Sequence, residues 1–324
     1  MSLYLPKPLP CWGVVNGGGK TSQVDTDIRD RAFKDHRFFI ETFFPDYFWG
    51  EMSPMHQDFC EIEQDPERQG VLEVTAAPRG HAKTVFRALV KPIHAIVYGY
   101  RHFIAIIGWS GPESDDKTGE IRDQLLQNEA LIRVYGKRVS GTAGKTDFVT
   151  LDQNTRVLSR STGGQIRGLR HKQWRPDMIV CDDILSLERV QTPEQREKTR
   201  QWFFKDVMGA KETKKAQAGR SVTNVHVINT VLHPEDLVTE LLNKPGWRRK
   251  RYQALISWAK RKDLWDEWKR LYTNLDNPDN VEDALAFYEA NKDDMLDGAQ
   301  VLWPEGDSYY DLMVYIIDNG LASF

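Results

Sequence analysis

The fold of this chain is decided by residues 71–84, VLEVTAAPRGHAKT. An apolar strand pattern leads into a short loop, and a helical pattern begins at Lys83 and Thr84. A phosphate-binding loop has the form G-x-x-x-x-G-K followed by Ser or Thr, and here alanine takes both glycine positions, Ala77 and Ala82. Backbone N–H groups at a helix N-terminus bind an anion whatever small side chains line the loop. We therefore expect Lys83 to contact the β- and γ-phosphates of ATP and Thr84 to bind Mg²⁺.

Three further residues of this loop, Arg79, Gly80 and His81, are expected to line the nucleotide together with Ala82. Gly80 can adopt the positive φ that a tight turn requires. Taken alone, the segment is also compatible with an ordinary strand, turn and helix in which Lys and Thr are adjacent by chance. An acidic motif downstream favours the phosphate loop.

That motif, residues 175–183 (RPDMIVCDD), is an apolar strand that ends in two carboxylates. Mg²⁺ takes an acidic ligand from a strand end beside the phosphate loop, so we expect Asp182 to serve the metal. Asp183 is then expected to polarise the attacking water, with Glu188 as a weaker candidate. Adjacent carboxylates at a buried strand end repel each other unless a cation lies there. A solvated strand end is the alternative interpretation.

A third apolar run, within residues 225–237 (VHVINTVLHPEDL), ends in Asn229 and Thr230. In a nucleotide-binding sheet of this kind, the neighbouring strand end places polar groups near the γ-phosphate, where they sense hydrolysis. We expect Asn229 and Thr230 to have this role. Strand residues that cap a turn are the alternative.

Strand patterns alternate with helical patterns over residues 70–245, which indicates an α/β fold with a parallel sheet. The predicted fold class is a P-loop NTPase of the ASCE/RecA-like type, in which helices flank a central, mainly parallel sheet. We expect a flexible arm at 1–34, an ATPase core at 35–258 and a small helical subdomain at 259–324. The arm contains GGGKT at 17–21, which follows no apolar strand and is not expected to bind phosphate.

The composition is that of an ordinary globular protein, with 324 residues of which 40% are apolar and 28% charged. A formal net charge of −3 gives no bulk support for nucleic-acid binding, so any such surface must be local. Three widely spaced cysteines match neither a disulfide framework nor a zinc site, which favours a reducing cytosol. No apolar run is long enough to span a membrane, and no signal peptide is evident.

The order of these motifs resembles the ATPase domain of phage large terminase subunits, the motors that package DNA into procapsids. The similarity runs from about residue 35 to the C-terminus and depends on the order and spacing of several segments together. The segments that carry it are MSPMHQ (52–57), APRGHAKT (77–84), GQIRGLR (164–170), RPDMIVCDDI (175–184) and INTVLHPEDL (228–237).

The resemblance implies a homo-oligomeric ring, expected to be a pentamer, that hydrolyses ATP with Mg²⁺ and moves double-stranded DNA through a portal protein. The small terminase subunit is the other implied partner. The implied location is the cytoplasm of an infected bacterial host, without membrane association. The resemblance also implies two functional arginines, Arg79 in the loop and one before the acidic pair that completes a neighbour's site. We expect the latter to be Arg167, with Arg170 and Arg175 as the other candidates, and we expect Gln57 to contact adenine.

Members of this family usually carry an RNase H-like nuclease domain beyond a linker. The chain ends near where that linker would begin, so nuclease activity is not expected from it. Two basic segments are candidate contacts for DNA phosphates, with solvated surfaces as the alternative. They comprise residues 247–252 (WRRKRY) and a loop with Lys211, Lys214, Lys215 and Arg220.

Two other functions compete with the packaging motor. A helicase-type ATPase needs a second α/β lobe of about 150 residues, and the residues after Thr230 are too few for one. A DNA-binding or scaffold module without catalysis would be favoured if the alanines of the loop prevent nucleotide binding. Loss of ATP turnover in Lys83→Ala would separate the enzyme from the scaffold.

Overall fold

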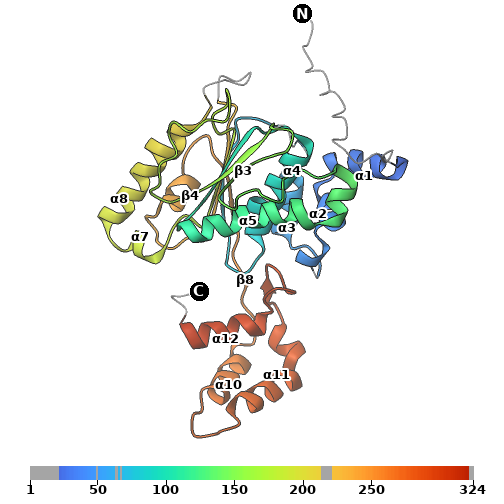
Figure 1. Ribbon diagram of the computed structural model, residues 1–324. Helices are drawn as coiled ribbons and strands as arrows, with labels where there is room; N and C mark the ends of the chain where they lie inside the picture. The colour runs from blue at the N-terminus through green and yellow to red at the C-terminus, as the bar shows by residue number, and fades with distance from the viewer. Residues whose placement is uncertain (1–21, 49, 63–64, 66–67, 213–220, 321–324) are drawn as a thin grey trace, which may run out of the picture.

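The structure is a computed structural model that describes residues 22–48, 50–62, 65, 68–212 and 221–320 (Figure 1). Its centre is a seven-stranded sheet with the order β3-β4-β2-β5-β6-β1-β7. All neighbouring strands run parallel except β3, which is antiparallel to β4. The strands are β1 (Leu72–Ala76), β2 (Phe103–Gly108), β3 (Asp147–Val149), β4 (Arg156–Ser161), β5 (Met178–Asp182), β6 (Asn224–Asn229) and β7 (Arg248–Arg251).

The central strands are buried along nearly their whole length because helices cover both faces of the sheet. In β2, Ile104 and Ile106 face one core, and Ala105 and Ile107 face the other. The first core takes side chains from the helices of residues 23–135, and the second from α7, α8 and α9. Figure 1 shows α1 to α4 on one side of the sheet and α7 and α8 on the opposite side.

The helices of the first face are α1 (Gln23–Lys34), α2 (His36–Phe43), η1 (Pro45–Tyr47), α3 (Pro54–Ile62), η2 (Val85–Val90), α4 (Lys91–Tyr98), α5 (Gly111–Gln127) and α6 (Glu129–Tyr135). Those of the second face are α7 (Leu187–Gln191), α8 (Pro193–Trp202), η3 (Phe203–Val207), η4 (Met208–Ala210) and α9 (Leu237–Leu242). The start of α8 has a typical helix-start sequence, because Thr192 caps the helix and Pro193 is its first residue.

The last part of the chain is mainly helical and has its own core. It contains β8 (Leu255–Ser257), α10 (Lys262–Tyr272), α11 (Asn280–Leu296), β9 (Gln300–Val301) and α12 (Tyr309–Asn319). Aromatic side chains dominate that core, among them Trp265, Trp268 and Tyr288. Figure 1 shows this group below the sheet. Trp303 connects the two parts, because its indole Nε1 donates to the carbonyl of Glu51 at 3.0 Å.

The predicted fold class, an α/β fold with a mainly parallel sheet flanked by helices, is confirmed. In the described part of the chain, no helix combines the length and the apolarity that a membrane span requires.

One sequence-based expectation needs correction. The flexible arm was predicted to reach residue 34, but residues 23–34 form α1, where Arg29 donates to the carbonyl of Val134 at 2.7 Å. The GGGKT segment of that arm lies outside the described residues. The basic segment at 247–252 contains β7, the edge strand beside β1, and the sequence did not predict this strand.

Candidate functional site

The candidate site lies at the carboxyl ends of four neighbouring strands, β1, β6, β5 and β2. In an open parallel sheet, ligands bind outside this edge. Ala76 of β1 is level with Asn229 of β6, and Asp182 of β5 is level with Ile228. The loop after β1 and the acid pair after β5 are therefore on the same edge, with only β6 between their strands. The two motifs come together as the sequence predicts.

The loop after β1 contains two residues with left-handed backbone conformations. Gly80 has φ 77°, which glycine adopts without steric cost. Ala82 has φ 53°, a conformation that costs a residue with a Cβ about 1–2 kcal/mol. Ala82 stands where the usual loop pattern has its second glycine, so the alanine retains the loop shape at the expense of backbone strain.

Lys83 directs its ammonium group into the loop rather than into solvent. The side chain is buried, and its Nζ donates to the carbonyl of Pro78 at 3.4 Å. The same Nζ lies 3.7 Å from Asp183 Oδ2. The cation therefore occupies the space that the loop encloses, next to the acid pair, where an anion would meet it.

Thr84 links the loop directly to the acid pair. Its hydroxyl donates to Asp182 Oδ1 at 3.2 Å, across 98 positions of sequence. Asp182 is fully buried, and burial raises the pKa of its carboxyl group, while the nearby Lys117 ammonium opposes that rise. Lys117 Nζ lies 2.6 Å from Asp182 Oδ2 and donates to the Asp182 carbonyl at 2.9 Å. The positive charge that the two adjacent carboxylates require is thus supplied by Lys117 beside Asp182 and by Lys83 beside Asp183.

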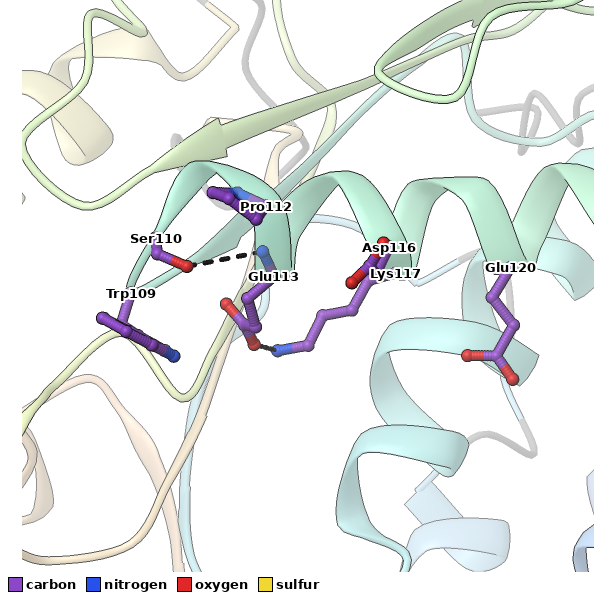
Figure 2. A pocket seen from close by; sticks show the side chains of 7 residues that line it. All are labelled: Trp109, Ser110, Pro112, Glu113, Asp116, Lys117 and Glu120. Atoms are coloured by element: carbon purple, nitrogen blue, oxygen red, sulfur yellow. Dashed lines mark hydrogen bonds and ion pairs between the residues drawn. The ribbon is translucent and has the colours of Figure 1, made fainter.

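Glu113 is a member of this site that the sequence analysis missed. It lies in the first turn of α5, which follows β2, and its carboxylate pairs with Lys117 one helical turn later (Figure 2). Ser110 caps the helix by accepting the Glu113 N–H. Burial raises the pKa of Glu113, again against the effect of Lys117. Glu113 and Lys117 also line an open pocket of about 640 Å³ beside Trp109.

Asn229 and Thr230 tie the ends of three strands together. Asn229 Oδ1 accepts the N–H of Leu185, just after β5, at 3.2 Å, and its Nδ2 donates to the Thr230 carbonyl at 2.6 Å. The Thr230 hydroxyl donates to the carbonyl of Ala77 at 3.1 Å. These contacts agree with the alternative that both residues cap turns, and they also place both at the sheet edge where the loop after β1 lies.

Two side-chain oxygens of the site are of the kind that could hold a metal ion together with a bound ligand. Among the residues that the structure describes, no group of three or more His, Cys, Asp or Glu could hold a metal alone. At nucleotide sites Mg²⁺ keeps several waters and takes one or two protein oxygens together with phosphate oxygens. Thr84 Oγ1 and Asp182 Oδ1, 3.2 Å apart, are oxygen ligands of this kind.

No model of a known protein family matches this chain, and no curated protein matches its sequence. The chain is similar to a solved phage protein. That structure is the large terminase of bacteriophage HK97, with a TM-score of 0.46 and 14% sequence identity. The match covers 85% of this chain and 54% of the terminase, so the chain spans about half the length of that protein.

Gln57, the predicted adenine contact, forms a hydrogen bond at the start of its own helix, α3. Gln57 is exposed, and its Nε2 donates to the carbonyl of Met52 at 3.0 Å. Arg79 is exposed on the loop itself. Glu188, the second candidate for the catalytic acid, is exposed in the first turn of α7.

The arginines before the acid pair lie on the surface rather than among the loop residues. Arg167 is exposed and packs against Gly209 of η4. The Arg170 side chain is also exposed, and Arg175 is half-buried, with its backbone N–H donating to Glu212 Oε2 at 2.8 Å. No ion pair of the Arg167 side chain is present among the described residues. This chain therefore does not aim these groups at its own loop.

His81 connects the loop to the C-terminal part of the chain. Its Nδ1 donates to the carbonyl of Arg79 at 2.8 Å and lies 3.6 Å from Asp307 Oδ2. The His81 carbonyl accepts from His56 Nε2 at 3.0 Å, and burial lowers the pKa of His56. The loop is therefore braced from α3 and from the segment that precedes α12.

The candidate DNA contacts are only partly described. Lys214, Lys215 and Arg220 lie outside the described residues. In β7, Lys250 forms an ion pair with Asp58 at 2.7 Å, a structural use of one of the basic residues. Alternate residues of β7, Arg249 and Arg251, are exposed.

Proposed function

We propose that this chain is the ATPase domain of a phage large terminase, which hydrolyses ATP to move double-stranded DNA into a procapsid. One observation carries the ATPase part of the proposal. The loop after β1 and the acid pair after β5 meet, with Thr84 bonded to Asp182 and Lys83 beside Asp183. A metal-bound triphosphate requires a cation and a hydroxyl at the N-terminus of a helix, with a carboxylate beside them. Lys83, Thr84 and Asp182 supply these three groups.

In this proposal each part of the loop has one task. Backbone N–H groups of residues 79–84 surround the phosphates, and the strained Ala82 keeps the loop in shape. Lys83 neutralises the β- and γ-phosphates. Thr84 and Asp182 hold the metal, directly or through water, and Mg²⁺ supplies charge neutralisation of the phosphate oxygens when it is bound.

The γ-phosphate end of the site is formed by the ends of β5 and β6. Asp183 and the polar pair Asn229 and Thr230 are proposed to contact the attacking water or the γ-phosphate. Their hydrogen bonds to the backbone after β5 and β1 support a sensing role, because loss of the γ-phosphate would be transmitted to both strands.

The motor part of the proposal rests on the motif order in the sequence. The proposed partners are double-stranded DNA, a portal protein, the small terminase subunit and further copies of this chain in a ring, within the cytoplasm of the bacterial host. Arg167 is exposed and makes no ion pair among the described residues, which suits a role in completing a neighbour's site. It therefore remains our choice, with Arg170 and Arg175 as the other candidates.

The test is ATP turnover with and without double-stranded DNA. Lys83→Ala should lower turnover by at least about 10²-fold, because it removes the cation that stabilises the phosphates. Lys137→Ala, an exposed lysine in the loop after α6, is the matched control and should retain wild-type turnover. Equal turnover in wild type and Lys83→Ala would refute the phosphate-loop assignment. DNA binding without any nucleotide binding would favour a scaffold module instead.

A further inference from the structure

The ammonium group of Lys117 joins two carboxylates that come from different strands. It lies 2.6 Å from Asp182 at the end of β5, and it also pairs with Glu113 in the helix that follows β2. Figure 2 shows Glu113 and Lys117 extending toward each other from the same side of α5. Lys117 therefore bridges the Glu113 carboxylate and the proposed metal ligand, Asp182.

The end of β2 is shaped to receive Glu113. Gly108 is the last residue of β2, and a Cβ there would overlap Glu113 Oε2 and also approach Ser114 Oγ at 2.8 Å. Glu113 Oε2 is buried and has no hydrogen-bond partner among the described residues. One oxygen of this carboxylate is thus paired with Lys117, and the other is a buried acceptor whose hydrogen-bonding capacity is not used by the described residues.

Asp183 has a different environment. Its side chain is 37% exposed and its nearest cation is Lys83, at 3.7 Å, the residue proposed to bind the phosphates. It is one methylene shorter than Glu113. Because Asp183 pairs with Lys83, it suits a contact at the γ-phosphate end of the site rather than acceptance of the water proton.

We propose that Glu113 is the carboxylate that accepts the proton of the attacking water, and that Lys117 holds it beside Asp182. This inference rests on the proposed ATPase function. The water oxygen forms a bond to the γ-phosphorus, and the bond from that phosphorus to the β,γ-bridging oxygen breaks, its electron pair leaving with ADP. The water proton passes to Glu113 and is then returned to inorganic phosphate or solvent. General base catalysis of this type contributes about 10²–10⁴-fold in rate.

The decisive comparison is between Glu113→Gln, Glu113→Asp and the control Asp116→Asn. Asp116 lines the same pocket on the same helix, but it is exposed and makes no ion pair with Lys117. The first readout is equilibrium binding of ADP and of a non-hydrolysable ATP analogue, each with Mg²⁺. The second is single-turnover ATP hydrolysis at saturating protein.

In Glu113→Gln, removal of a negative charge near the γ-phosphate should raise the preference for the ATP analogue over ADP about tenfold. Its turnover should fall at least 10²-fold. Glu113→Asp keeps the charge, so it should retain the wild-type preference and lose turnover. Asp116→Asn should match wild type in both readouts.

Two failures are distinguishable. If the wild-type chain binds neither nucleotide with Mg²⁺, the proposed function fails and this inference fails with it. If wild type binds and hydrolyses ATP, while Glu113→Gln stays within threefold of it in both readouts, the inference alone is refuted. A collapse of turnover in Asp183→Asn but not in Glu113→Gln would assign the water to Asp183.

Discussion

Replacement of Lys117 by methionine tests the electrostatics of the site without any nucleotide. Methionine keeps much of the apolar stem of lysine and removes the ammonium group that lies 2.6 Å from Asp182 Oδ2. Asp182 is fully buried and Lys117 is only 13% exposed, so water can replace little of the lost interaction. Removing one partner of a buried ion pair costs about 3–5 kcal/mol. Because the Thr84 hydroxyl still donates to Asp182, we expect the lower end, about 3 kcal/mol.

The assay is urea unfolding at pH 7 in the presence of a chelator, followed by far-ultraviolet circular dichroism. Four proteins complete a double-mutant cycle, namely wild type, Lys117→Met, Asp182→Asn and the double variant. In the double variant the buried charge is gone together with its partner. Glu113 still lacks its lysine partner in the double variant, so the part of the loss that belongs to Asp182 should be recovered, with a coupling free energy of about 2 kcal/mol.

Two results would refute this reasoning. A free energy of unfolding for Lys117→Met within about 0.5 kcal/mol of wild type would mean that the pair is effectively a surface ion pair. Additive effects of the two single substitutions would mean that Lys117 and Asp182 do not interact in solution.

The other predictions concern strain and protonation. Ala82→Gly removes the cost of a left-handed alanine, so it should raise the free energy of unfolding by up to about 1 kcal/mol in the same urea assay. A clear loss of stability would contradict the φ of 53° at this position. Burial, helped by the positive charge of Lys91, lowers the pKa of His226 to about 4 in the folded chain. Because the unfolded chain then binds the proton more readily, stability should be level above about pH 6.5 and should fall by about 3 kcal/mol as the pH drops toward 4. Urea unfolding at several pH values should give a shallower acid-side slope in His226→Gln, and identical slopes in the two proteins would show that His226 is not responsible.

Local sequence patterns predicted the parts of the fold that depend on neighbours in the chain. Buried parallel strands are recognisable as mainly apolar runs. β2 and β5 are of this kind, and β1 and β6 are recognisable although each includes polar residues such as Glu73 and His226. β7 was missed because its sequence, RRKR, has no apolar alternation, and it is a strand only through its pairing with β1 at the sheet edge.

The candidate site was predictable where a motif has its own signature. The loop and the acid pair have one, and their meeting follows from parallel strands sharing an edge. Glu113 has none, because a Glu–Lys pair four residues apart is a common surface feature of helices. Its position becomes informative only when the sheet order places β2 beside β5, and that order is set by long-range packing.

The arginines show a different limit of sequence reasoning. An arginine that completes a neighbour's site has no partner within its own chain, so its sequence context resembles that of any exposed arginine. Within the described residues Arg167 has this character, because it is exposed and lies against Gly209. Only an assembly can distinguish it from Arg170.

The central claim is that residues 78–84 bind a metal-bound triphosphate beside the acid pair. The most direct test is a crystal structure of the chain with Mg²⁺ and a non-hydrolysable ATP analogue. We predict phosphate oxygens within hydrogen-bond distance of Lys83 Nζ, and Mg²⁺ in contact with the Thr84 hydroxyl, next to Asp182. A nucleotide bound elsewhere on the molecule, or phosphates that touch neither Lys83 nor Thr84, would contradict the account.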